Sequence, residues 1–203
     1  MFYEPRKKNH GFAHNPINAL VAPRPVGWIS TLSTSGKLNL APFSYFNLMS
    51  YHPPVVVFAA DAWKDTVVNV EATKEFVCNV ATLELLEPMV MSSAPLPHGE
   101  SEFELAKLEP APSTLVKPPR VAASPCALEC VWTETIQIKD RNGDLLDRPL
   151  IFGEVIGVYI NEDFIEDGQV RADKMHTVGR CGYLGDYAAI ERFYIQERPV
   201  KHG

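Results

Sequence analysis

The stretch from residue 128 to residue 160 constrains the fold most, because it has the pattern of two long antiparallel strands joined by a turn. Apolar and polar side chains alternate over 128–139, which is the period of a half-buried strand. The turn contains Asn142-Gly143, a pair that favours the left-handed positions of a type I′ hairpin. Residues 150–160 provide the returning strand. Both strands of such a hairpin need further antiparallel partners.

Shorter strand-like runs can supply these partners. They are predicted at 26–33, 38–41, 55–60 and 75–80, with helices at 65–73 and, interrupted by Pro88, at 84–93. Prolines are dense from 94 to 125, which predicts a long irregular excursion. Many short strands and few helices indicate a mainly β fold, an antiparallel barrel that is closed or nearly closed.

The charge and the termini exclude several classes of protein. The formal net charge of −6 argues against nucleic acid as a partner, because nucleic-acid binding requires a basic face. The sequence contains no polybasic anchor and no run of about eighteen apolar residues, so no membrane association is expected. The first residues lack the apolar core of a secretory signal, and the cysteines form no Cys-x-x-Cys pair. We therefore expect free thiols and a cytoplasmic protein.

A single domain is expected. The 203 residues suffice for one sizeable core, and neither an internal repeat nor a linker divides them. We expect an N-terminal arm over 1–18, one barrel domain over 19–195 and a C-terminal tail over 196–203. The histidines are scattered without ligand spacing, so no metal site is expected.

The segment from Pro23 to Asn47 has the composition of a ligand-binding corner. Two short strands run into Ala-Pro-Phe-Ser at 41–44, where Pro42 marks the end of strand pairing or an edge. The small Ala41 would let a flat ligand approach the backbone. Hydroxyls would reach a polar tail of that ligand; they belong to Ser30, Thr31 and Ser44. Flavin mononucleotide (FMN) is such a ligand, and the alternative is an ordinary proline turn with its aromatic residues in the core.

A second candidate feature is Lys64-Asp65-Thr66 at the start of the helix predicted over 65–73. The N-terminus of a helix carries partial positive charge and stabilises a phosphate. Lys64 adds a full charge and Thr66 a hydroxyl, while Asp65 is the expected N-cap. The alternative is an ordinary helix start with a solvated lysine.

Four short motifs occur in order along the chain: Pro23-Arg-Pro-Val-x-Trp-Ile-Ser-Thr31, Gly36-x-x-Asn39-Leu-Ala-Pro-Phe-Ser-x-Phe46, Ser50-x-x-Pro-Pro-Val55 and Lys64-Asp-Thr66. With this order and spacing, the chain resembles the flavin reductase-like family over residues 19–187. The resemblance implies an FMN-binding split β-barrel, a homodimer with FMN near the subunit interface, and electron transfer from reduced nicotinamide (NADH or NADPH) to flavin. It also implies that the flavin is contacted by Ser30, Thr31, Asn39, Ala41, Pro42, Phe43, Ser44, Lys64, Asp65 and Thr66.

The later part of the chain departs from the family pattern. Many flavin reductases carry a Gly-x-x-His-x-x-Phe element, whereas here His98-Gly99 precedes Phe103 in another order. A Gly-Gly-x-x-Tyr element is replaced by Gly182-Tyr183 in Arg-Cys-Gly-Tyr. We add Trp28 as a further flavin contact and His98 as a substrate contact; the alternatives are a core tryptophan and a solvated loop histidine.

These observations lead to three hypotheses. The first is an NAD(P)H:flavin oxidoreductase that accepts hydride at flavin N5 and serves a monooxygenase or another redox protein. The flavin carries the chemistry, so no side chain is assigned a catalytic role. The second is a flavoredoxin-like FMN electron carrier without its own nicotinamide site. The third is a barrel that binds no flavin and acts as a binding or structural module.

Overall fold

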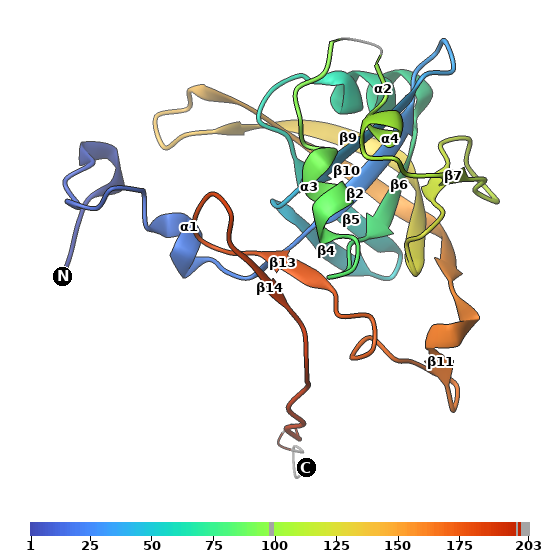
Figure 1. Ribbon diagram of the computed structural model, residues 1–203. Coiled ribbons are helices and arrows are strands. Elements are labelled where there is room, and N and C mark those ends of the chain that lie inside the picture. Colours follow the sequence, from blue (N-terminus) through green and yellow to red (C-terminus); the bar gives the residue numbers. More distant parts are fainter. Residues whose placement is uncertain (98–99, 198, 200–203) are drawn as a thin grey trace.

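A seven-stranded antiparallel sheet forms the body of the protein in the computed structural model, which describes residues 1–97, 100–197 and 199 (Figure 1). The order of its strands is β3-β2-β6-β9-β10-β5-β4. Their bounds are Gly27–Leu32 (β2), Leu38–Phe43 (β3), Phe46–Tyr51 (β4), Pro54–Ala59 (β5), Glu75–Val80 (β6), Cys126–Lys139 (β9) and Leu145–Ile160 (β10). Within the described strands no ladder joins β3 to β4, so these edges leave a seam that makes the barrel split, as predicted.

The long hairpin of β9 and β10 is confirmed, and β10 begins at Leu145, earlier than expected. The prediction of a type I′ turn is wrong. Such a turn needs a positive φ at both central residues, and here Gly143 has a φ of +91° while Asn142 does not enter the left-handed region. The Asp140 carboxylate accepts hydrogen bonds from the backbone N–H groups of Asn142 (2.7 Å) and Asp144 (3.1 Å). These bonds favour an Asx-type turn closed by a left-handed glycine over a two-residue primed turn.

The core is divided by β2, whose side chains alternate between two apolar clusters. Ile29 packs inside the barrel with Phe58 and Phe76. Trp28 packs on the opposite face with Met89 and other buried residues. This is the predicted period of two, and it decides which side chains of β2 can approach a ligand.

Helix α2 (Asp65–Thr73) covers the barrel beside β2 and β3, and its Val67 and Val70 are fully buried in the inner cluster. Its last residue, Thr73, is the one predicted from the sequence. The outer cluster is covered by α3 (Leu86–Met91), which is shorter than predicted but retains Pro88. The proline-dense stretch is more ordered than expected, since it contains α4 (Glu102–Leu105), β7 (Pro110–Ala111) and β8 (Arg120–Val121).

The remaining elements lie outside the barrel. A small sheet has the order β1 (Arg24–Pro25), β13 (Val178–Arg180) and β14 (Tyr187–Ala189). The other short elements are η1 (Pro5–Lys7), α1 (Ile17–Leu20), η2 (Glu162–Phe164), β11 (Ile165–Glu166) and β12 (Gln169–Val170). The N-terminal segment projects from the body on the same side as the β9–β10 hairpin (Figure 1), and Arg6 reaches Asp140 of that hairpin at 2.7 Å.

All four cysteines are free thiols, as expected. Among the described residues, no helix has the length and apolar character needed to cross a membrane.

Candidate functional site

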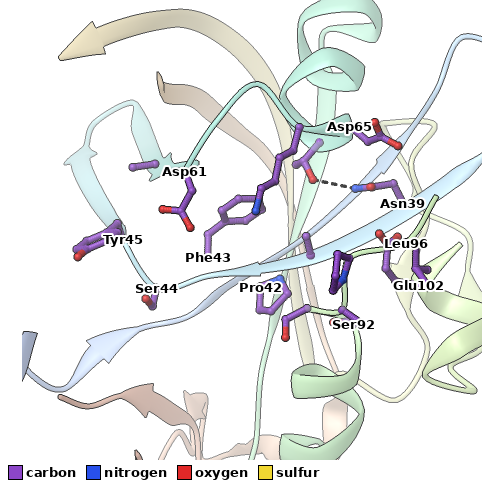
Figure 2. Close-up of a pocket in the computed structure, with 17 residues that line it drawn as sticks. Asn39, Pro42, Phe43, Ser44, Tyr45, Asp61, Asp65, Ser92, Leu96 and Glu102 are labelled. Atoms are coloured by element: carbon purple, nitrogen blue, oxygen red, sulfur yellow. Dashed lines mark hydrogen bonds between the residues drawn. The ribbon is translucent and has the colours of Figure 1, made fainter. Parts of the chain in front are cut away.

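A cavity of about 550 Å³ follows β3 at the split edge of the barrel. This volume lies within the range of about 300–1,000 Å³ that is usual for small-molecule sites. Figure 2 shows Asn39 and Glu102 toward one end of β3 and Ser44 and Tyr45 toward the other. We call these the inner end and the outer end of the cavity.

The wall supplied by β3 is apolar and stiff. Ala41 and Pro42 line it together with Phe43, whose ring lies 4.8 Å from that of Phe58. Pro42 is paired with Trp28 of β2, and the ladder continues to Phe43. Pro42 therefore does not end the strand pairing; it lies in an edge strand, which was the other interpretation. An edge strand tolerates proline because its outward N–H has no ladder partner to lose.

A buried network of amides and hydroxyls fixes the inner end. Asn39 Nδ2 donates to Thr66 Oγ1 at 2.9 Å (Figure 2) and to Thr31 Oγ1 at 3.2 Å. Asn69 Nδ2 donates to the same Thr31 oxygen at 3.1 Å. The network ties β2, β3 and α2 together, so Thr31 holds the wall from behind while Asn39 and Thr66 line the cavity.

The start of α2 contributes Lys64, Asp65 and Thr66 to the cavity, as the sequence predicts. The prediction of Asp65 as N-cap is wrong. The carbonyl of Lys64 accepts the N–H groups of Val67 (2.9 Å) and Val68 (3.1 Å), which makes Lys64 the cap residue and Asp65 the first helical residue. An acidic side chain is still favourable in that first turn because it complements the helix dipole.

Three predicted flavin contacts do not line the cavity: Trp28, Ser30 and the Thr31 described above. Trp28 is fully buried and its Nε1 donates to Ser92 Oγ at 2.9 Å. Ser30 is also fully buried and donates to the Pro119 carbonyl at 2.6 Å. Ser92 itself lines the cavity, so Trp28 positions a wall residue. The predicted substrate contact His98 lies outside the described residues.

Two parts of the lining were not predicted from the sequence. They are the far wall, opposite β3, formed by residues 92–96 and Glu102, and the outer rim at Tyr45, Ala59 and Asp61. The missed lining residues are Tyr45, Ala59, Asp61, Ser92, Ser93, Ala94, Pro95, Leu96 and Glu102. The spacing Ser101-x-x-Glu104 is a capping-box signal that could have located α4 and with it Glu102. No comparable signal marks the residues from Ser92 to Leu96.

At the outer rim, two guanidinium groups lie near the ring of Tyr45. The Cζ atoms of Arg24 and Arg148 lie 5.6 and 5.4 Å from the ring centroid. Arg148 also pairs with Asp61 at 2.6 Å, and the Tyr45 hydroxyl donates to Asn18 Oδ1 at 2.9 Å. At the rim the charge of Asp61 is therefore paired with that of Arg148.

Glu102 is the acidic residue of the inner end. Its Oε2 accepts the backbone N–H of Leu40 at 2.9 Å. Burial raises the pKa of this carboxyl above its ordinary value, and the charge of Asp65 raises it further, while the bond from Leu40 acts in the opposite direction. The inner end thus holds a carboxyl that accepts a proton more readily than one in water.

Comparison with known proteins identifies the fold. The structure matches component B of nitrilotriacetate monooxygenase from Bacillus cereus with a TM-score of 0.88 and 26% identity, over 97% of this chain and 98% of that one. It matches a split-barrel protein from Shewanella frigidimarina NCIMB 400 with a TM-score of 0.79 and 23% identity, over 98% and 94% of the two chains.

The sequence comparisons agree. An uncharacterized protein of Aquifex aeolicus strain VF5 is 36% identical over 172 residues, which is 82% of this chain and 84% of the relative. The model of the flavin reductase like domain matches residues 21–175. The boundaries expected between the N-terminal arm and the barrel domain, after residue 18, and between that domain and the C-terminal tail, after residue 195, stay predictions. The chain belongs to the flavin reductase-like family.

Proposed function

We propose that this protein binds FMN in the cavity along β3 and acts as an NAD(P)H-dependent flavin reductase. Family membership supports a flavin-binding redox protein. The observation that carries the finer proposal is that one cavity gathers the motif residues of two separate segments. These residues are Asn39, Ala41, Pro42, Phe43, Ser44, Lys64, Asp65 and Thr66.

The chemistry of the cavity fits FMN. Ala41, Pro42 and Phe43 offer an apolar surface for a flat ring, while the hydroxyl of Ser44 suits a ribityl chain. Lys64, the hydroxyl of Thr66 and the partial positive charge at the start of α2 suit a phosphate. Trp28 and Thr31 would act through the wall residues that they bond, Ser92 and Asn39.

Bound FMN would supply the redox chemistry by accepting a hydride at its N5 atom. The role of the chain is to bind and orient the ring against a stiff wall. The buried network of Asn39, Thr31 and Thr66 keeps that wall in place before a ligand arrives, which lowers the ordering cost of binding. We assign no side chain a catalytic role.

A homodimer with the flavin site near the subunit interface is part of this proposal. The edge strand β4 leaves Leu48, Met49 and Tyr51 at least half exposed, directly after the rim residue Tyr45. An exposed apolar edge strand is a surface that proteins usually cover. The resemblance to a monooxygenase component B supports a monooxygenase or another redox protein as the downstream partner. The cytoplasmic location stays a prediction.

Spectroscopy under anaerobic conditions tests the proposed function. The purified protein should show flavin absorption after addition of FMN, and this absorption should bleach when NADH or NADPH is mixed in. Bleaching by a reduced redox protein but by neither nicotinamide would instead support the electron carrier. A protein that ignores added FMN would contradict flavin binding altogether.

A further inference from the structure

Tyr45 lines the outer end of the cavity, but its side chain is held by residues that do not line it. Its backbone carbonyl accepts the N–H of Ala59 at 2.8 Å, which ties the corner between β3 and β4 to β5. Exposed side chains change rotamer freely on the nanosecond timescale. Here the hydroxyl of the 45% exposed Tyr45 donates to Asn18 Oδ1 at 2.9 Å, so the tip of the ring is anchored.

The anchor residue Asn18, which belongs to α1, is held in turn by Arg24. The Nη1 atom of Arg24 donates to the backbone carbonyl of Asn18 at 2.7 Å and to that of Val21. The Nη2 atom donates to the carbonyl of Cys181 at 3.0 Å, directly after β13. One guanidinium therefore joins the segments before β1 and after β13 to the residue that anchors Tyr45. We call these bonds of Asn18 and Arg24 the brace.

The burial of Arg24 is unusual for a charged side chain. The residue is only 8% exposed, it forms no ion pair within the part of the chain that the structure describes, and its Nε lacks a hydrogen-bond partner there. Burying a charge without an opposite charge costs free energy. The planar fork of arginine can, however, reach several carbonyls at once while its Cζ lies 5.6 Å from the centroid of the Tyr45 ring. The arrangement therefore favours the placing of that ring.

The ring of a bound flavin would lie toward Tyr45. In the binding mode proposed above, Lys64 and Thr66 hold the phosphate, and Thr66 belongs to the inner end through its bond with Asn39. The isoalloxazine then extends along Pro42 toward the outer end, where Figure 2 shows Tyr45. Contacts between aromatic rings depend on geometry, so a fixed tyrosine serves such a contact better than a mobile one.

We propose that Arg24 is a positioning residue which, through Asn18 and its own guanidinium, holds the ring of Tyr45 as an end wall against the flavin ring. This proposal rests on the flavin site proposed above. Because the brace lies outside the cavity, the rim can lose the ion pair between Asp61 and Arg148 without moving the ring. Arg148 is a matched comparison: its Cζ lies 5.4 Å from the ring centroid, but its hydrogen bond goes to Asp61 and not to Asn18.

The fluorescence of bound FMN tests this contact, because a tyrosine that touches a flavin quenches its emission. Tyr45→Leu should raise the fluorescence yield of bound FMN several-fold. Arg24→Met keeps an unbranched side chain at the buried position, and it should reproduce most of this rise. It should also weaken FMN binding by about three- to tenfold, the range for losing one aromatic contact. Arg148→Met is the control and should keep the wild-type yield.

A second variant covers the case in which Arg24→Met does not fold. Asn18→Ala removes the anchor of the Tyr45 hydroxyl but keeps the backbone carbonyl that Arg24 bonds, and it should raise the yield in the same direction. An unchanged yield in Asn18→Ala or in Tyr45→Leu would overturn the proposal. A rise in Arg148→Met as large as that in Arg24→Met would do the same.

The brace can also be measured without flavin. Nitration of Tyr45 by tetranitromethane, located by peptide mass spectrometry, should be several-fold faster in Asn18→Ala than in the wild type, because the released ring is more accessible to the reagent. Equal rates would contradict the brace. Absence of FMN binding in the wild type would instead defeat the proposed function, so the two failures are distinguishable.

Discussion

The two ends of the cavity are built differently. At the inner end Asn39 and Thr66 are buried and bound to side chains behind the wall. At the outer end Tyr45 and Asp61 are exposed, and Asp61 is paired with Arg148, whose side chain is also partly exposed. Buried polar networks are costly to break, whereas surface ion pairs contribute little. The difference teaches that the inner end is preorganised and that the outer end tolerates change.

The largest effect is expected at the centre of the inner network. Asn39→Ala removes two side-chain hydrogen bonds and leaves the hydroxyls of Thr31 and Thr66 with fewer partners. The free energy of unfolding should fall by about 3 kcal/mol, the upper part of the range for buried groups that lose a partner. Urea denaturation measures it, with the exposed Asn47→Ala on β4 as control. A loss no larger than that of the control would contradict preorganisation.

The cationic part of the cavity should distinguish FMN from riboflavin. Lys64→Ala combined with Thr66→Ala should weaken FMN binding by roughly 1–3 kcal/mol, because charged hydrogen bonds to the phosphate are lost. Riboflavin, which has no phosphate, should lose less. Flavin fluorescence quenching gives both affinities, and Lys139→Ala plus Thr133→Ala on β9 is the exposed control. Equal losses for both flavins would show that these residues do not hold the phosphate.

A smaller effect is expected behind the wall. Trp28→Phe removes the hydrogen bond to Ser92 while keeping an aromatic ring in the outer cluster. We expect the free energy of unfolding to fall by at least about 1 kcal/mol, because one buried hydrogen bond is lost and the smaller ring leaves a cavity. Thermal unfolding measures this, and Trp63→Phe, at an exposed position, is the matched control. Stability identical to that of the control would mean that Ser92 is held by other contacts.

The smallest effect is expected at the outer rim. Arg148→Ala breaks the ion pair with Asp61, in which the two side chains are 38% and 67% exposed. The free energy of unfolding should change by about 0–1 kcal/mol, the range for surface ion pairs, and less at high salt. Arg141→Ala at the hairpin turn is the control. A loss as large as that of Asn39→Ala would remove the distinction between the two ends.

Much of the barrel could be predicted because its strands alternate with a period of two and its turns carry glycine. The same alternation does not predict which of the polar side chains on these strands line the cavity and which lie outside it. Ser30, Thr31 and Asn39 have similar chemistry in adjacent strands, yet only Asn39 lines the cavity. This depends on the register of β2 with β3 and on the position of α2, which are tertiary properties.

The far wall was harder to predict for a different reason. Residues from Ser92 to Leu96 follow α3 without a repeating pattern, and α4 has only four residues. Such short elements are stabilised by tertiary contacts and by the hydrogen bond of Glu102 to β3. Local sequence therefore says little about Glu102, although the capping-box spacing was present.

The two edge strands β3 and β4 are joined by Ser44 and Tyr45, and the ring of Phe46 lies against Gly27, where even a methyl group would come within 2.6 Å of it. Side chains therefore fill the space between Gly27 and Phe46, while the main-chain ladders run on either side of the seam. A barrel of this design can be adapted to a ligand of different thickness by substituting a few side chains at the seam, without changing the backbone hydrogen bonds between its strands.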